Sequence, residues 1–187
     1  MRKTVLNTTH AFITAVLLTL WLASPASAQP ANIQWMSLEE VAAKNKTAPK
    51  KIFLEIYTEW CDWCKKMDTS TLERDHIRKF LNENFYSVRF DAEQKSEVSF
   101  NNKVYKYAKV GTRGYNAFAT EMLNGRLSFP SLVFLDEDMQ VIQTIEGYKS
   151  PEDFEKIITY FATDQYKKVP WSSFIRTYKP MKVKEKN

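Results

Sequence analysis

The sequence predicts an α/β fold in which helices flank a central sheet. Three observations lead to this prediction: an apolar run at residues 51–58, helical spacing of apolar residues after it, and two strand-like runs around an acidic turn near residue 136. Their order along the chain is strand, helix, strand, hairpin and helix. With 187 residues, of which 44% are hydrophobic and 26% charged, the chain has the size and composition of one globular domain with additions.

The first predicted strand, residues 51–58, is rich in aliphatic and aromatic residues, a pattern that indicates burial on both faces. Beyond Cys61 the pattern becomes helical for about two turns. A second helix is indicated near residues 75–81, where apolar residues are spaced i, i+3 and i+4. Residues 85–90 then form the next expected strand.

The second half of the expected sheet is a hairpin. Its strands are Ser131–Leu135 and residues 141–145, which an acidic turn separates. A helix is predicted over Pro151–Ala162, because Ser150 is a favourable N-cap and proline is favoured at the first helical position.

Residues 93–126 are expected to be an insert between the two halves of the sheet. Strand-like runs at 98–100 and 104–107 flank a short polar turn, which predicts a hairpin. Apolar residues from 115 to 122 then fall at helical spacing, and Gly125 follows as an expected C-cap. The sequence therefore predicts a hairpin followed by a helix.

The N-terminus has the pattern of an export signal. Two basic residues precede an apolar run from Ala11 to Ala23, and small residues follow up to Ala28. The run is shorter than the roughly 20 residues that span a bilayer, so a leader retained as an anchor is the alternative. We expect a cleaved signal peptide at 1–28, a domain at 29–165, a C-terminal extension with a short helix at 166–187, and a location in the periplasm or outside the cell.

Charge and cysteine content exclude several classes of protein. The 27 basic and 22 acidic residues leave a small surplus concentrated in the C-terminal lysines, so we expect no nucleic-acid partner. Two cysteines are too few for a disulfide-stapled scaffold. A zinc site needs four ligands, and His76 is the one histidine outside the leader; Lys65 stands where a c-type haem motif needs histidine. We expect no metal and no cofactor.

The two cysteines, Cys61 and Cys64, lie where a strand is expected to lead into a helix. Free N–H groups and the positive end of the helix dipole stabilise a thiolate at the first position. We therefore expect Cys61 to attack a partner and form a mixed disulfide, and Cys64 to resolve it. The alternative is a pair of buried structural cysteines.

The residues around the cysteines form a motif that occurs in a known family. The motif is Thr58-Glu59-Trp60-Cys61-Asp62-Trp63-Cys64-Lys65, with a tryptophan before the first cysteine and a lysine after the second. It resembles the thioredoxin superfamily from about residue 54 to residue 162, and its continuation is similar to exported thioredoxin-like proteins that include the C-terminal domain of DsbD. The resemblance implies a thioredoxin-like fold, with a central mixed sheet flanked by helices and an insert before the cis-proline strand. We expect Trp60 and Trp63 to contact substrate.

The resemblance also implies roles for residues outside the motif. Glu55 matches a buried acid beneath the resolving cysteine, which would take the proton from Cys64. Pro130 matches the cis-proline of the family, which would lie opposite the cysteines and offer the backbone of Phe129 to a substrate chain. Gly147 matches a glycine that lets partners approach closely. The alternatives are an exposed edge-strand glutamate and a trans loop proline.

The sequence departs from thioredoxins in three places. Asp62 and Trp63 replace Gly-Pro between the cysteines, and an acid beside Cys61 opposes its thiolate while it interacts favourably with the helix N-terminus. Phe129 is bulkier than the usual residue before the proline and would narrow the substrate groove. The lysine that thioredoxins keep near the buried acid corresponds to Ser87.

We therefore expect an exported thiol-disulfide oxidoreductase that reduces protein disulfides through its cysteine pair. Its expected partners are oxidised substrate proteins and a membrane thiol-electron donor of the DsbD kind. A disulfide oxidase or isomerase is one alternative, because direction depends on the reduction potential. A module that binds copper(I) through the two cysteines and a redox-silent interaction domain are the others.

Overall fold

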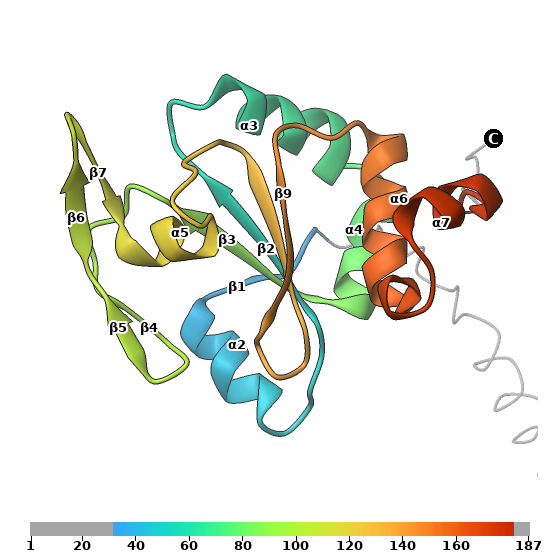
Figure 1. Ribbon diagram of the computed structural model, residues 1–187, viewed down its shortest axis with the longest axis horizontal. Coiled ribbons are helices and arrows are strands. Elements are labelled where there is room, and N and C mark those ends of the chain that lie inside the picture. The colour runs from blue at the N-terminus through green and yellow to red at the C-terminus, as the bar shows by residue number, and fades with distance from the viewer. Residues whose placement is uncertain (1–31, 182–187) are drawn as a thin grey trace, which may run out of the picture.

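A computed structural model describes residues 32–181 of the protein (Figure 1). The expected signal peptide, residues 1–28, lies outside the described residues. The central sheet has five strands in the order β1–β3–β2–β8–β9, which span Trp35–Met36, Tyr86–Asp91, Ile52–Tyr57, Ser131–Leu135 and Val141–Glu146. The strands β1, β3 and β2 are parallel, and β8 runs antiparallel to both β2 and β9. The expected α/β fold with a mixed central sheet is confirmed.

The strand β2 lies in the middle of the sheet because both of its faces are apolar. Leu54 and Ile56 belong to the hydrophobic core on one face, and Phe53 belongs to the core on the other. The strand β8 is divided in the same way, with Val133 in the first core and Phe134 in the second. Each core is then covered by its own set of helices.

Helices α4, α6 and α7 cover one face, on the right of Figure 1; they span Asp75–Asn84, Pro151–Ala162 and Trp171–Thr177. The side chain of Ser150 accepts a hydrogen bond from the Asp153 N–H at 3.2 Å, so the predicted cap of α6 is confirmed. Phe154 of α6 packs on Phe53 with ring centroids 5.4 Å apart. The short helix expected in the C-terminal extension is α7.

The opposite face is covered by helix α2 (Leu38–Asn45) and by the insert, on the left of Figure 1. Neither β1 nor α2 was expected from the sequence. Helix α2 begins at Ser37, whose side chain accepts a hydrogen bond from Glu40 N–H, and Glu40 returns one to the Ser37 N–H. This capping box makes the start of α2 a local property of the sequence.

The insert consists of two hairpins and a helix. The hairpins are β4–β5 (Val98–Phe100 and Lys103–Tyr105) and β6–β7 (Tyr107–Val110 and Arg113–Asn116), and the helix is α5 (Ala117–Met122). Asn101 and Asn102 form the first turn with φ values of 48° and 62°, as a tight two-residue hairpin requires.

Three expectations for the insert were wrong. The C-cap of helix α5 is Leu123 and not Gly125, which lies two residues further on. The predicted strand 104–107 is divided between the two hairpins, and Tyr115 belongs to β7 and not to the helix. Helix α5 begins after Asn116, whose side chain accepts a hydrogen bond from the Phe118 N–H at 3.0 Å. The cap, and not the apolar spacing, fixes the start of this helix.

Within residues 32–181, no helix combines the length and the apolar character that crossing a membrane requires.

Candidate functional site

A disulfide bond joins Cys61 and Cys64 where β2 leads into helix α3 (Asp62–Met67), at the top of Figure 1. Cys61 is the N-cap residue of this helix, with extended backbone, and its Sγ accepts a hydrogen bond from the Cys64 N–H at 3.0 Å. The sulfur of Cys61 thus lies at the end of the helix where backbone N–H groups have no helical partner. The helix continues without a break into a π-helical turn, Asp68–Leu72.

The two cysteines are buried, and the two tryptophans beside them are exposed. Cys61 and Cys64 retain 5% and 1% of their accessible surface, whereas Trp60 and Trp63 retain 47% and 56%. Large exposed aromatic side chains are uncommon away from binding surfaces. The disulfide is thus flanked by two exposed aromatic rings.

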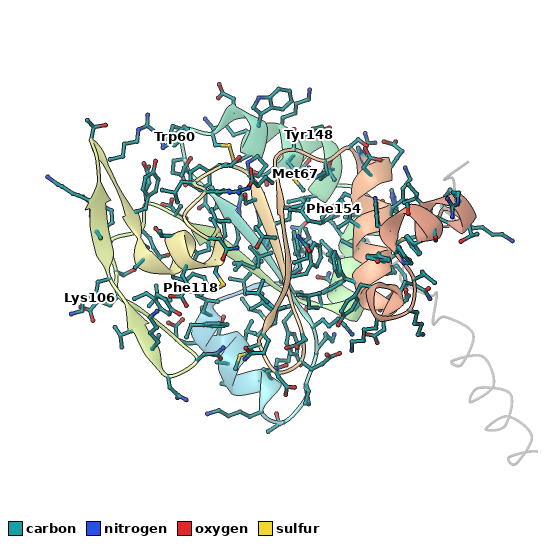
Figure 2. The ribbon with its side chains drawn as sticks, viewed as in Figure 1. Trp60, Met67, Lys106, Phe118, Tyr148 and Phe154 are labelled. Carbon is teal, nitrogen blue, oxygen red and sulfur yellow. A yellow bond between two sulfur atoms is a disulfide. The ribbon has the colours of Figure 1, made fainter. Side chains whose placement is uncertain are left out.

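Trp60 belongs to a group of four side chains that we call the Trp60 cluster: Trp60, Phe129, Tyr115 and Arg113. The Trp60 ring meets Phe129 edge to face at 5.9 Å, and Phe129 lies 6.0 Å from Tyr115. The guanidinium of Arg113 lies 4.1 Å from the centre of the Trp60 ring. Figure 2 labels Trp60 near the yellow disulfide. Sequence reasoning placed Tyr115 in a helix and did not single out Arg113.

Trp63 belongs to a second group, the Trp63 cluster, with Tyr148 and Lys66. The rings of Trp63 and Tyr148 are 5.5 Å apart, and Nζ of Lys66 lies 4.7 Å from the first and 5.2 Å from the second. The hydroxyl of Tyr148 is hydrogen-bonded to Ser70 at 3.0 Å, which fixes the ring beside α3. Tyr148, labelled in Figure 2, was not expected at the site, although it directly follows Gly147.

Phe129, Pro130 and Gly147 lie in one structural unit. The peptide bond between Phe129 and Pro130 is cis, and the Pro130 carbonyl accepts a hydrogen bond from the Gly147 N–H at 2.7 Å. Gly147 has a φ of +79°, in the left-handed region that favours glycine, and no heavy atom lies within 4 Å of the position that a Cβ would occupy. The structure therefore brings Gly147 next to the proline loop and leaves the space above it open.

Glu55 is fully buried in β2. Because side chains alternate along a strand, Glu55 faces the same side of the sheet as Phe53, and that core also contains Met67 of α3. Burial and the charge of Asp68 raise the pKa of Glu55 from 4.5 to about 8, and Arg89 opposes this rise. Glu55 therefore lies on the face of the sheet that is packed by helix α3, the helix that contains Cys64.

The cation beside Glu55 is Arg89, which was not expected from the sequence; the family's lysine corresponds to Ser87 in the sequence comparison. Strand pairing places Glu55 opposite Arg89 and places Phe53 opposite Ser87. The Nε of Arg89 lies 3.3 Å from Oε2 of Glu55, and its Nη2 lies 2.5 Å from Oδ2 of Asp68. Arg89 lies two residues beyond Ser87 on β3, and it could not be identified as the partner from the sequence because the register between two strands is a non-local property.

No group of three or more His, Cys, Asp and Glu side chains suited to a metal ion occurs among residues 32–181.

A family model described as a thioredoxin-like domain matches residues 37–162. An uncharacterized protein of Caenorhabditis elegans is 31% identical over 133 residues, which is 70% of this chain and 16% of that protein. Spermatogenesis-associated protein 20 of Rattus norvegicus is 37% identical over 67 residues, 36% of this chain and 8% of that protein. The chain thus spans less than a fifth of the length of these two relatives.

Disulfide bond reductase DsbH of Chlamydia pneumoniae is 28% identical over 109 residues, which is 58% of this chain and 59% of that protein. Among solved structures, a DsbH oxidoreductase has a TM-score of 0.53 at 21% identity and covers 76% of this chain and 92% of its own. A thioredoxin from Thermus thermophilus has a TM-score of 0.54 at 14% identity and covers 72% of this chain and 90% of its own. These structures share the fold described above.

Proposed function

The chain belongs to the thioredoxin-like domain family, and from this membership we propose that it is a thiol-disulfide oxidoreductase that reduces protein disulfides. The observation that carries the proposal is the Cys61–Cys64 disulfide at the first turn of α3, between two exposed tryptophans. A disulfide that closes so short a loop constrains little chain entropy, which favours a redox role over a structural one.

The proposed reaction starts from the dithiol form of the protein. The thiolate of Cys61 attacks one sulfur of the substrate disulfide, so that a mixed disulfide forms and the other substrate sulfur leaves as a thiolate. The thiolate of Cys64 then attacks the Cys61 sulfur, which closes the Cys61–Cys64 bond and releases the second substrate thiol. The substrate gains two electrons and two protons, and the protein loses them.

Glu55 is the proposed acceptor of the Cys64 proton. A carboxyl whose pKa is raised to about 8 changes its protonation close to neutral pH, where an acid–base group transfers protons most effectively. Glu55 is also fully buried, and it lies on the face of the sheet that α3 covers.

Two observations support reduction as the physiological direction. The relative from Chlamydia pneumoniae is named a disulfide bond reductase. The exposed carboxylate of Asp62, next to Cys61, disfavours the Cys61 thiolate and so favours the oxidised form of the protein, which makes its reduced form the better electron donor. We propose oxidised proteins of the periplasm or the cell exterior as substrates, export through residues 1–28, and a membrane thiol donor of the DsbD kind as the source of electrons.

The first experiment is insulin reduction by the wild type and by the Cys61→Ser variant in the presence of a thiol donor. The proposal expects activity in the wild type and none in Cys61→Ser. The Cys64→Ser variant is the matched control, because it should stall at the mixed disulfide and trap its partner. Equal turnover by all three proteins would contradict the mechanism.

The second experiment separates a reductase from an oxidase. Equilibration of the cysteine pair against glutathione should give a reduction potential near or below about −250 mV; a value near about −120 mV would identify an oxidant. A copper(I) titration of the reduced protein tests the metal-binding alternative in the same preparation.

A further inference from the structure

The hairpin β6–β7 reaches the active site although it is not part of the central sheet. Its two strands pair with each other in a separate two-stranded sheet, which stands to one side of the molecule in Figure 1. Its contact with the site is made by side chains of β7: Arg113 lies on Trp60 and Tyr115 lies near Phe129. The insert therefore supplies half of the Trp60 cluster.

The two faces of this hairpin have different surroundings. Arg113 and Tyr115 are two residues apart on β7, so both point to the face that meets Trp60 and Phe129. Lys109 is paired with Gly114, and both lie on the opposite face. On that face the ring of Tyr107 covers Gly114 so closely that it leaves no room for a Cβ there. The hairpin thus presents Arg113 on the face that meets Trp60 and Lys109 on the opposite face.

Stacking on Trp60 positions the guanidinium of Arg113 so that it can still bind an acidic group. A guanidinium that lies over an aromatic ring keeps its N–H groups at its edges free for hydrogen bonds. Arg113 is exposed, and it makes no ion pair within 4.0 Å with an acid of the described chain. The acids nearest to Trp60 in the sequence have other contacts, since Asp62 lies 3.7 Å from Lys65 and Glu59 accepts a hydrogen bond from Tyr57.

We propose that Arg113 is a specificity-determining residue that binds a carboxylate of the substrate protein close to its reactive disulfide. A planar guanidinium held in place is suited to bidentate recognition of a carboxylate, and the stack removes part of the entropy cost of binding. Substrates with glutamate or aspartate around the reactive cysteine are preferred over substrates with lysine there. This inference rests on the proposed function, because it concerns the same site.

The experiment uses two peptides that differ in charge alone. Each contains one internal disulfide, flanked on both sides by glutamate in the first peptide and by lysine in the second. The dithiol form of the full chain reacts with each peptide in a single turnover, followed by the fluorescence of the tryptophans. The wild type should react about fivefold faster with the glutamate peptide, as expected for an exposed charge pair, and added salt should reduce this ratio.

Three variants test the assignment. Arg113→Gln should bring the ratio of the two rates to about one, and Arg113→Glu should invert it. Lys109→Gln removes the same charge from the opposite face of the same hairpin and should keep the wild-type ratio. Because each ratio compares two peptides on one protein, a general change in cysteine reactivity cancels, and equal reduction potentials of the variants confirm an intact site.

The inference is overturned if Arg113→Gln retains the wild-type ratio, or if Lys109→Gln lowers the ratio as much as Arg113→Gln does. In either case the dithiol protein still reduces both peptides, so the proposed function stands. If neither peptide is reduced by the wild type, the proposed function itself fails and the inference fails with it.

Discussion

Arg89 on β3 lies directly opposite Glu55 on β2, with 3.3 Å between its Nε and Oε2 of the glutamate, yet the carboxyl remains hard to ionise. Burial dominates, because Glu55 is fully enclosed while Arg89 is partly exposed and is shared with Asp68. A pKa raised to about 8 means that the folded protein holds a proton that the unfolded chain releases above pH 4.5. This difference has consequences for stability and for reactivity.

The first prediction concerns stability. Between pH 4.5 and about 8 the unfolded chain loses the Glu55 proton while the folded chain keeps it, so the wild type loses stability as the pH rises. The Glu55→Gln variant lacks this loss and should become more stable than the wild type at pH 8, by an amount on the order of 4 kcal/mol at most. Urea unfolding of both oxidised proteins at pH 5 and pH 8 measures the difference.

The control for this prediction is Asp138→Asn, which removes an exposed carboxylate in the turn after β8. It should leave the pH dependence of stability unchanged. A Glu55→Gln variant whose stability changes with pH as the wild type does would show that Glu55 is not the group responsible.

The second prediction concerns the Arg89 charge. Because Arg89 lowers the pKa of Glu55, the Arg89→Gln variant should raise it above its wild-type value, by about one unit. Titration of the Glu55 side-chain carboxyl by ¹³C NMR measures this directly. Lys79→Gln, on the exposed surface of α4, is the matched control and should give the wild-type midpoint. A lower midpoint in Arg89→Gln would contradict the assignment of Arg89 as the partner.

The third prediction concerns the acid between the cysteines. The side chain of Asp62 is 96% exposed and adjoins Cys61, so its charge acts on the thiolate weakly and through solvent. Asp62→Asn should stabilise the thiolate and therefore raise the reduction potential, by roughly 10 mV. Glutathione equilibration measures the change, with Asp138→Asn as the control. A more negative potential in Asp62→Asn would contradict the proposed effect of Asp62 on the Cys61 thiolate.

The fourth prediction concerns the C-terminal segment after α7. Buried Glu155 on α6 accepts hydrogen bonds from the Tyr178 hydroxyl at 2.5 Å and from the Met181 N–H at 2.6 Å, and lies 3.2 Å from His76. Glu155→Leu removes the Oε1 atom that accepts both hydrogen bonds and leaves the two donors without this partner, which should cost about 1–3 kcal/mol of stability. Hydrogen exchange over residues 171–181 should become faster.

The matched control is Lys156→Gln, which breaks a surface pair with Asp153 on the same helix and should cost less than about 1 kcal/mol. Unchanged exchange over residues 171–181 in Glu155→Leu would mean that Glu155 does not hold this segment.

Most elements with local signals were predictable from the sequence, and elements fixed by distant partners were not. Helix α2 is the exception, since it was missed although a local capping box marks its start. Strand β2 is recognisable from its apolar run, and helix α6 from its N-cap serine and the proline that follows; each signal spans only a few residues. The strand β1 has two residues and exists because it pairs with β3. Tyr115 has the spacing of a helical residue, but Asn116 behind it caps the helix and leaves Tyr115 in a strand.

The same distinction applies to the site. The cysteine pair, Glu55 and the proline loop could be found from residue spacing together with a family resemblance. Arg89 required the register between two strands, and Arg113 and Tyr148 required tertiary contacts with exposed tryptophans. No pattern along the chain encodes which loop will cover a given ring, so these residues became visible in the structure alone.

Helix α5 makes the insert part of the hydrophobic core, which matters for any attempt to shorten or transplant this domain. Phe118, labelled in Figure 2, is fully buried and packs on Phe90 of the central sheet at 4.8 Å, with Phe100 and Tyr105 around it. Shortening residues 93–126 to a tight loop would leave helix α2 as the main cover of this face of the sheet and cost several kcal/mol for this ring alone, on the order of 3–5. Engineering is best confined to the two hairpin tips, since Asn101, Asn102 and Gly111 are exposed there.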